Sequence, residues 1–324
     1  MSAIVTADDE QRVRIGLDVG GTKTDALALD AAGAVLARVR VSTGWGEEAV
    51  VRSIRDAVAA LRAQPELRGR TPASVGVGMP GQVEPGGSHV VHAVNLGIDR
   101  LDVALALAPA LGVPVRVEND VKAAALGAST LDGRSGSMAY LNLGTGIAAG
   151  IVVDGALWRG PRGSAGEIGH ISVDPDGPLC RCGQRGCIEA LAGGRAVAER
   201  WGRPGVLPVR DVFDAADAGD PSALRLRDGV AVGVAAAVRV LVLTAGVEEV
   251  VLGGGLTALT PRLTADVERV LAASALASPF LRSLELSARV RPLPPGSPAA
   301  ALGAALVGAA GDAERVPGEV LAGG

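Results

Sequence analysis

Residues 13–29 read VRIGLDVGGTKTDALAL, and this stretch decides the class of fold. Apolar residues on both sides of a polar Gly-Gly-Thr turn predict two strands, over residues 13–19 and 24–29, and residues 34–41 predict a third. A helix is expected only afterwards, over residues 47–62. Because a Rossmann fingerprint or a Walker loop requires a helix directly after its glycines, the sequence disfavours both of these nucleotide sites.

The same pattern returns near the middle of the chain. A strand is expected over residues 137–143, followed by the turn Gly144, Thr145 and Gly146 and by a strand that ends at residue 153. The chain is therefore internally duplicated. Two such units, one in each of two lobes around a central cleft, would offer backbone N–H groups to a polyphosphate. This predicts an α/β protein with the two-lobed actin-like ATPase (ribonuclease H-like) fold.

The length of 324 residues also suggests two lobes. We expect a smaller N-terminal lobe over residues 1–120, joined by a C-terminal helix at about 298–312, and a larger lobe over residues 121–297. Further strands are expected over residues 74–77, 113–117 and 250–252, and further helices near residues 103–110, 121–128, 194–200, 221–243, 263–273 and 299–310.

Composition argues against several classes of protein. With 31 basic and 35 acidic residues the formal net charge is −4, which gives no broad footprint for nucleic acid. The most apolar stretch, residues 231–245, is short and contains Arg239, so we expect a buried helix and no membrane span. Residues 1–14 carry acidic residues where a signal peptide would be basic and then apolar, so we expect a cytoplasmic protein.

All three cysteines lie in one short segment, as Cys180, Cys182 and Cys187. Together with His170 they supply four ligands of the type that closed tetrahedral zinc sites use. A redox thiol pair, with His170 elsewhere, is the alternative. Four protein ligands leave no position for a metal-bound water, so the expected zinc is structural.

Three glycine clusters are candidate nucleotide sites. In the first, glycines let the backbone approach phosphate oxygens, a threonine adds a donor, and Asp18 can hold Mg²⁺ directly or through water; its residues are Asp18, Gly20, Gly21, Thr22 and Lys23. The second is the turn at Gly144. The third, at Gly253, Gly254 and Gly255, follows a strand and could admit adenosine. An ordinary glycine hairpin and a strand-to-helix turn are the respective alternatives for the first and third.

Asp120 is the candidate catalytic base. It lies between a predicted strand and a predicted helix, where ligands meet α/β sheets, and it can accept a hydroxyl proton while the oxygen attacks a γ-phosphoryl group. A helix cap at Asn119 or Asp120 is the alternative. Polar groups that could hold sugar hydroxyls are Asn95, Asn119, Glu167 and Glu189, although either glutamate could be a solvated surface residue.

Together these motifs resemble the ROK family of bacterial repressors, sugar kinases and related open reading frames. Residues 163–189 match its signature, including the run CRCGQRGCIE at 180–189, and residues 75–81 match its Gly-x-Pro-Gly segment. The first phosphate motif, the Asn119-Asp120 pair and the third glycine cluster match as well. The resemblance therefore covers essentially the whole chain.

The resemblance implies the roles of the matching residues. Asp120 would be the catalytic base, and the sugar contacts would be Asn95, Asn119, Glu167, His170 and Glu189. One ring nitrogen of His170 would bind zinc and the other a sugar hydroxyl. The family also implies ATP and Mg²⁺, a structural Zn²⁺, and a homodimer, possibly a tetramer, formed mainly by the second lobe. Lys122 departs from the small or neutral residue expected beside Asp120, so it either perturbs the base or points to solvent.

The expected reaction is ATP-dependent phosphorylation of a hexose at the 6-hydroxyl, with glucose favoured. N-acetylglucosamine, N-acetylmannosamine, mannose and fructose present a similar face and are alternatives. A sugar-responsive repressor is a rival reading, but only about a dozen residues precede the first strand, too few for a helix-turn-helix and its wing. A sugar-binding protein without catalysis is a second rival.

Overall fold

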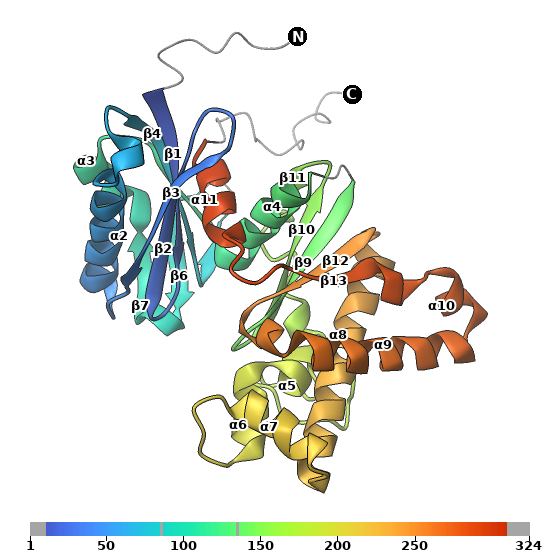
Figure 1. Cartoon of the computed structure of the whole chain (residues 1–324). Coiled ribbons are helices and arrows are strands. Elements are labelled where there is room, and N and C mark those ends of the chain that lie inside the picture. Colours follow the sequence, from blue (N-terminus) through green and yellow to red (C-terminus); the bar gives the residue numbers. More distant parts are fainter. Residues whose placement is uncertain (1–10, 85–86, 134–135, 310–324) are drawn as a thin grey trace, which may run out of the picture. The chain divides into compact units, whose positions relative to one another are not determined.

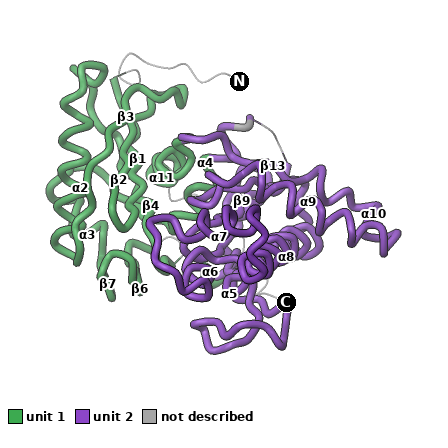
Figure 2. Tube along the Cα trace, turned by 60° about the horizontal axis from the view of Figure 1, so that its bottom comes forward, with its two compact units in different colours: residues 1–127, 161–163, 298–324 green, residues 128–160, 164–297 purple. Residues whose placement is uncertain are grey.

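The structure is a computed structural model that describes residues 11–84, 87–133 and 136–309 (Figure 1). The chain divides into two compact units, coloured separately in Figure 2. Unit 1 consists of Met1–Gly127, Pro161–Gly163 and Pro298–Gly324, and unit 2 of Ala128–Gly160 and Ser164–Ser297. The boundary expected at residue 120 coincides with the first residue of helix α4 (Asp120–Asp132), and the division falls inside that helix. The acidic residues used to argue against a signal peptide, Asp8, Asp9 and Glu10, lie outside the described residues.

Each unit contains a five-stranded sheet. The strands of unit 1 are β1 (Arg12–Val19), β2 (Lys23–Leu29), β3 (Val35–Ser42), β4 (Thr71–Met79) and β8 (Val115–Asn119), in the order β3-β2-β1-β4-β8. Those of unit 2 are β9 (Ser137–Leu143), β10 (Ile147–Val153), β11 (Ala156–Leu157), β12 (Glu249–Gly253) and β13 (Val290–Pro292), in the order β11-β10-β9-β12-β13.

The two sheets have the same topology. In each, the first three strands form an antiparallel meander, and the next two join it in parallel, as β4 and β8 do in unit 1 and as β12 and β13 do in unit 2. The predicted internal duplication and the actin-like ATPase fold class are therefore confirmed.

Helices cover both faces of the sheet in unit 1. Helix α2 (Glu47–Arg62) buries Val50, Ile54 and Leu61 at helical spacing, and its acidic first turn and basic last turn suit the helix dipole. Alternation along β1 sends Ile15 and Leu17 into this core and leaves Gly16 on the opposite face. A Cβ on Gly16 would lie 1.9 Å from the oxygen of Ala301, so the glycine permits helix α11 (Ala299–Ala309) to pack directly on the strand. The expected last residue of this helix, 310, lies outside the described residues.

The remaining elements of unit 1 are α3 (Val103–Leu111) and a small sheet of β5 (Gln82–Val83), β6 (His89–Ala93) and β7 (Ile98–Asp102), paired in that order. A short 3₁₀ helix, η2 (Val94–Leu96), joins β6 to β7 and carries Asn95. The small sheet was not predicted from the sequence.

The sheet of unit 2 packs with helices α5 (Ile188–Ala192), α6 (Gly194–Trp201), α7 (Pro208–Asp217), α8 (Pro221–Ala245), α9 (Thr260–Ala277) and α10 (Pro279–Ser283). Within the described residues, α8 is the one helix long and apolar enough to cross a bilayer by length and composition. More than half of its apolar window is buried in the protein, which a core helix also shows. Its buried residues include Val230, Val234, Val238 and Leu241.

Candidate active site and metal centre

The first phosphate motif forms the tight turn between β1 and β2. The amide N–H of Gly20 donates to the carbonyl oxygen of Lys23 at 2.9 Å, while Gly21, Thr22 and Lys23 are exposed. A Cβ on Gly21 would lie 2.9 Å from the carbonyl oxygen of Asn95, so the turn lies directly beside η2. The candidate phosphate turn and one candidate sugar contact are thus neighbours in unit 1.

Asp18 and Asp120 lie on either side of Gly78. Asp18, on β1, is paired with Gly78 of β4, and a Cβ on Gly78 would lie 3.7 Å from the Cα of Asp120. Burial raises the pKa of Asp18 to about 7, helped by the negative charges of Asp120 and Asp25 and opposed by Arg38 and Arg40. Carboxylate oxygens near one another and partly removed from water are the donors that Mg²⁺ prefers, so the residues fit the expected cation.

The raised pKa of Asp18 predicts a stability that depends on pH. Because the folded-state pKa of about 7 exceeds the ordinary value of 3.8, the folded protein binds more protons in that interval, and stability falls as pH rises through it. The variant Asp18→Asn lacks this titration, so at pH 8 we expect it to be more stable than the wild type by on the order of 2 kcal/mol, allowing for partial exposure. At pH 4 the difference should be small.

Urea unfolding without Mg²⁺ at the two pH values measures this effect. Asp99→Asn is the matched control, because the Asp99 side chain is 93% exposed. Its replacement should change the free energy of unfolding appreciably at neither pH 4 nor pH 8. A stability difference for Asp18→Asn that is the same at pH 4 and pH 8 would contradict the assignment.

Asn119 forms the cap of helix α4. Its Oδ1 accepts from the amides of Val121 and Lys122 at 3.0 and 3.2 Å, and its Nδ2 donates to the carbonyl oxygen of Gly81 at 3.1 Å. The capping role considered for this pair is therefore present, and Asn119 also ties the helix to the Gly-x-Pro-Gly segment. Asp120 is partly exposed at the first position of the helix, and its Oδ1 accepts from the amide of Val121.

Lys122 does not point to solvent. Its side chain is buried, and its Nζ donates to the carbonyl oxygen of Gly163. Gly163 immediately precedes the Ser164–Ala165–Gly166–Glu167 stretch of the family signature. The structure thus shows the unusual lysine holding the chain where the signature segment begins.

In unit 2, Glu189 supports the second glycine turn. Its Oε2 accepts from the amide of Ile147 at 3.0 Å, and the amides of Gly194 and Arg195 donate to the carbonyl oxygens of Gly144 and Thr145. Glu189 is half-buried, so it is not the solvated surface residue considered as an alternative. Its sugar contact stays a prediction.

The third glycine cluster adjoins this turn. Gly253 ends β12, and a Cβ on Gly254 would lie 2.6 Å from the carbonyl oxygen of Leu143, the residue before the turn. The 3₁₀ helix η4 (Gly255–Leu259) and then α9 follow directly, so the cluster is a strand-to-helix turn. Gly255 is exposed, with no atom within 4 Å of an added Cβ, which leaves the adenosine prediction open.

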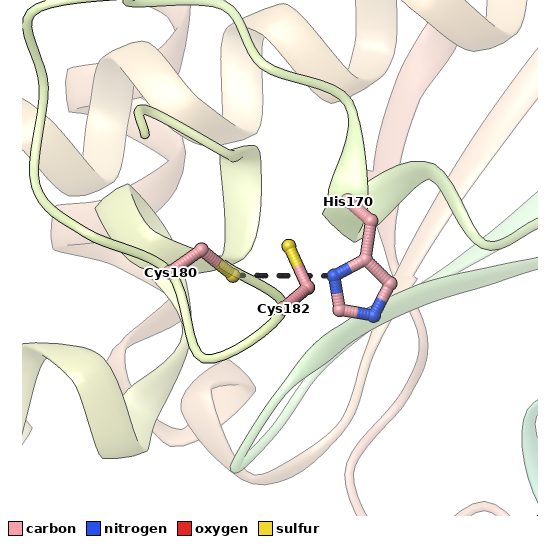
Figure 3. Close-up of side chains that lie close together, drawn as sticks. All are labelled: His170, Cys180 and Cys182. Atoms are coloured by element: carbon pink, nitrogen blue, oxygen red, sulfur yellow. Dashed lines mark hydrogen bonds between the residues drawn. The ribbon is translucent and has the colours of Figure 1, made fainter. Parts of the chain in front are cut away.

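The metal ligands predicted from sequence lie together in unit 2. The ligand atoms of His170, Cys180 and Cys182 are all within 4.8 Å of one another, and Nδ1 of His170 lies 4.0 Å from Sγ of Cys180 (Figure 3). Cys187 joins the group through its Sγ, 3.6 Å from that of Cys182. Zn–S bonds of about 2.3 Å at tetrahedral angles place two sulfurs about 3.8 Å apart, so the spacing of Cys182 and Cys187 suits zinc. Three of the four predicted ligands, His170, Cys180 and Cys182, form the mutually close group, and Cys187 adjoins it through Cys182.

The thiols are arranged to lose protons unequally. Hydrogen bonds from Gln184 lower the pKa of Cys182 to about 6, whereas burial and then the neighbouring Cys182 raise the pKa of Cys187 to about 12. Gln184 Nε2 also donates to the carbonyl oxygen of His170 at 3.1 Å. Gln184 was not among the site residues predicted from the sequence, although its place inside the Cys-x-Cys-Gly-x-x-Gly-Cys run was the available signal.

Glu167 and His170 stand at the two ends of one short turn. Glu167 precedes the 3₁₀ helix η3 (Ile168–His170), and both side chains are exposed. The amide of His170 donates to the carbonyl oxygen of Glu167 at 3.3 Å, so one short turn joins the two residues. Figure 3 shows the second ring nitrogen of His170 directed away from the two labelled sulfurs. That nitrogen is free of the metal cluster, as a sugar contact requires.

Comparisons with known proteins show what this chain is similar to. Residues 14–309 match the ROK family. A glucokinase of Halalkalibacterium halodurans is 32% identical over 283 residues, which cover 81% of this chain and 86% of that protein. An N-acetylmannosamine kinase of Shigella boydii serotype 18 is 33% identical over 215 residues, which cover 65% of this chain and 72% of that protein.

Two solved structures are similar over almost their whole length. The ROK hexokinase from Thermus thermophilus has a TM-score of 0.76 at 34% identity. The aligned region covers 92% of this chain and 98% of the hexokinase chain. A ROK family glucokinase from Streptomyces griseus, in complex with glucose and AMPPNP, has a TM-score of 0.72 at 29% identity and covers 92% of this chain and 99% of its own.

Proposed function

The chain belongs to the ROK family and is a sugar kinase, and from that premise we propose that it transfers the γ-phosphoryl group of ATP to the 6-hydroxyl of glucose. The observation that carries the proposal is the placement of Asp18 and Asp120 on either side of Gly78, beside the first phosphate turn. A cation ligand and a base next to a phosphate turn are the parts that phosphoryl transfer needs.

In the proposed reaction Asp120 accepts the proton of the 6-hydroxyl while the hydroxyl oxygen attacks the γ-phosphorus of ATP, and the bond from that phosphorus to the β–γ bridging oxygen breaks, so that ADP leaves. Asp18 would hold Mg²⁺, which supplies charge neutralisation on the phosphates. The turns at Gly20 and Gly144 would bind phosphate oxygens through backbone N–H groups, and Gly255 would leave room for adenosine. The cap on α4 made by Asn119 fixes the backbone from which Asp120 projects.

Asn95, Asn119, Glu167, His170 and Glu189 are the proposed sugar contacts. Carboxylates accept from sugar hydroxyls, and amides and the free imidazole nitrogen exchange hydrogen bonds with them. His170, Cys180, Cys182 and Cys187 would hold a zinc that gives the loop of Glu167 and His170 a fixed shape. We further propose a cytoplasmic homodimer whose partners are sugar and ATP, without nucleic acid.

Glucose and N-acetylmannosamine are the two sugars to be distinguished, because relatives of both kinds match this chain at nearly equal identity. They differ at carbon 2, where one has a hydroxyl and the other a bulky acetamido group. A site built for the first should reject the second by about 10- to 100-fold or more in kcat/KM.

A coupled ADP-release assay with a panel of hexoses and N-acetylhexosamines tests this proposal. We expect the highest kcat/KM for glucose, and NMR of the product should place the phosphate on carbon 6. A higher kcat/KM for N-acetylmannosamine would replace glucose as the proposed substrate while leaving the sugar kinase assignment intact.

A further inference from the structure

Trp45 is an exposed indole on a firmly held loop. Its side chain is 69% exposed, in the loop between β3 and α2. Three backbone amides of this loop donate hydrogen bonds to other segments. The amide of Thr43 donates to the carbonyl oxygen of Thr22 at 3.0 Å, and that of Gly44 donates to Oγ of Ser53 at 2.9 Å. The amide of Gly46 donates to the carbonyl oxygen of Leu96 at 2.8 Å. Each of these bonds reaches another segment of unit 1 or the following helix, so the indole is presented to solvent by an ordered backbone.

The indole lies against Gly97, which follows η2. A Cβ on Gly97 would come within 2.5 Å of Cε2 and 2.6 Å of Nε1 of Trp45, and φ at this glycine is +69°. Only glycine therefore leaves Trp45 its observed position. The carbonyl oxygen of Asn95, two residues earlier, borders the phosphate turn at Gly21. Trp45, Asn95 and the first phosphate turn thus form one continuous stretch of the surface of unit 1.

This combination suits a sugar ring. A pyranose offers hydroxyls at its edge and C–H groups on its faces, so a polar side chain beside an exposed aromatic face can contact both at once. The bond from Gly46 to Leu96 O fixes the indole relative to the segment that carries Asn95, so the two contacts are held in register. Trp45 lies outside all of the sequence motifs that match the family.

We infer that Trp45 is a substrate-binding residue that packs on the apolar face of the sugar substrate. The inference rests on the proposed function, since it names a further contact in the same site. An indole that makes an apolar contact in both the ground state and the transition state changes substrate affinity more than the chemical step.

The first test replaces the side chain. Trp45→Ala should raise KM and the dissociation constant for glucose by about 10- to 100-fold, change kcat by less than about threefold, and leave KM for ATP unchanged. Trp45→Phe keeps an aromatic face and should recover most of the affinity. Trp158→Phe is the control, because Trp158 is also exposed but belongs to unit 2, whereas Trp45, Gly97 and Asn95 belong to unit 1.

The second test moves the indole without removing it. Gly97→Ala should displace Trp45 and raise KM for glucose, whereas Gly112→Ala should not. The pair is matched, because φ at Gly112 is +67° and no atom lies within 4 Å of an added Cβ there. Both variants therefore bear the same backbone strain, and only one meets the indole.

A double-mutant cycle assigns the Gly97 effect to its cause. If Gly97→Ala acts through Trp45, it should raise KM for glucose little or not at all in a Trp45→Ala background. Additive effects would show that Gly97→Ala does not act through the indole, which would contradict this part of the inference.

Fluorescence gives a readout that a purely structural role would not move. The chain has three tryptophans, so glucose should protect part of the emission of the wild type from acrylamide, and this protection should vanish in Trp45→Phe but persist in Trp158→Phe. Unchanged glucose affinity in Trp45→Ala, together with protection that survives Trp45→Phe, would overturn the inference. A wild type without sugar-dependent ADP release would instead refute the proposed function, so the two failures are distinguishable.

Discussion

Asp120→Asn should lower kcat for sugar phosphorylation by at least about 10²- to 10⁴-fold, the usual contribution of a general base. Asparagine keeps the size and one oxygen acceptor of the side chain but cannot take the proton that the attacking hydroxyl loses. Oδ1 of Asp120 accepts a hydrogen bond from the amide of Val121, and the side-chain oxygen of asparagine can accept the same bond. The fold of the α4 start should therefore survive, and affinities for sugar and ATP should change by about tenfold or less.

Steady-state kinetics and calorimetric binding of sugar and nucleotide measure the two parts of this prediction separately. Asp154→Asn is the matched control, since Asp154 is exposed in a turn of unit 2 with φ of +50°, a conformation that asparagine tolerates, and its activity should equal that of the wild type. Substantial turnover by Asp120→Asn, with host kinases excluded, would mean that Asp120 serves only the start of the helix.

Loss of the metal should be the second large effect. We expect about one zinc per chain by elemental analysis, and removal by a chelator, or the variant Cys187→Ala, should abolish most activity. Zinc binding is coupled to the folding of its site, and a loss of several kcal/mol in a domain of this size should lower Tm by on the order of 10 °C. Added zinc should restore the activity and Tm of the chelated wild type but not those of Cys187→Ala.

Arg181→Ala provides the control for this experiment. Arg181 lies between two of the cysteines but is exposed and forms an ion pair with Glu199, so its removal leaves all four ligands in place and should keep zinc content and activity. A zinc-free protein with full activity and an unchanged Tm would contradict the structural role of the metal. It would also contradict the proposal that zinc supports Glu167 and His170.

The parts of the fold that were predicted well are those with a local signal. The meander around Gly20 and its repeat around Gly144 each have two apolar strands next to a glycine turn, and α2 was predicted with its observed bounds because its apolar residues keep helical spacing. The cysteine cluster was predictable for the same reason, since three of its four ligands lie within eight residues of sequence, from Cys180 to Cys187.

The parts that were missed depend on partners far along the chain. The strands β5, β6 and β7 have at most five residues each, too short for a clear alternation, and they are held by pairing with one another. Lys122 donates to the carbonyl oxygen of Gly163, 41 residues away, and Glu189 accepts from the amide of Ile147, 42 residues before it. The proximity of the Trp45 ring to Gly97 could not be predicted, because no sequence pattern links these two distant residues.

The most direct test of the account is transfer of the γ-phosphoryl group of labelled ATP to glucose, measured in parallel for the purified wild type and Asp120→Asn. Both proteins should bind glucose, but Asp120→Asn should label the sugar at least about 10²-fold more slowly than the wild type, and the label should be on carbon 6. Absence of labelled sugar with the wild type, or equal labelling by both proteins, would contradict the assignment of this chain as a sugar kinase with Asp120 as its base.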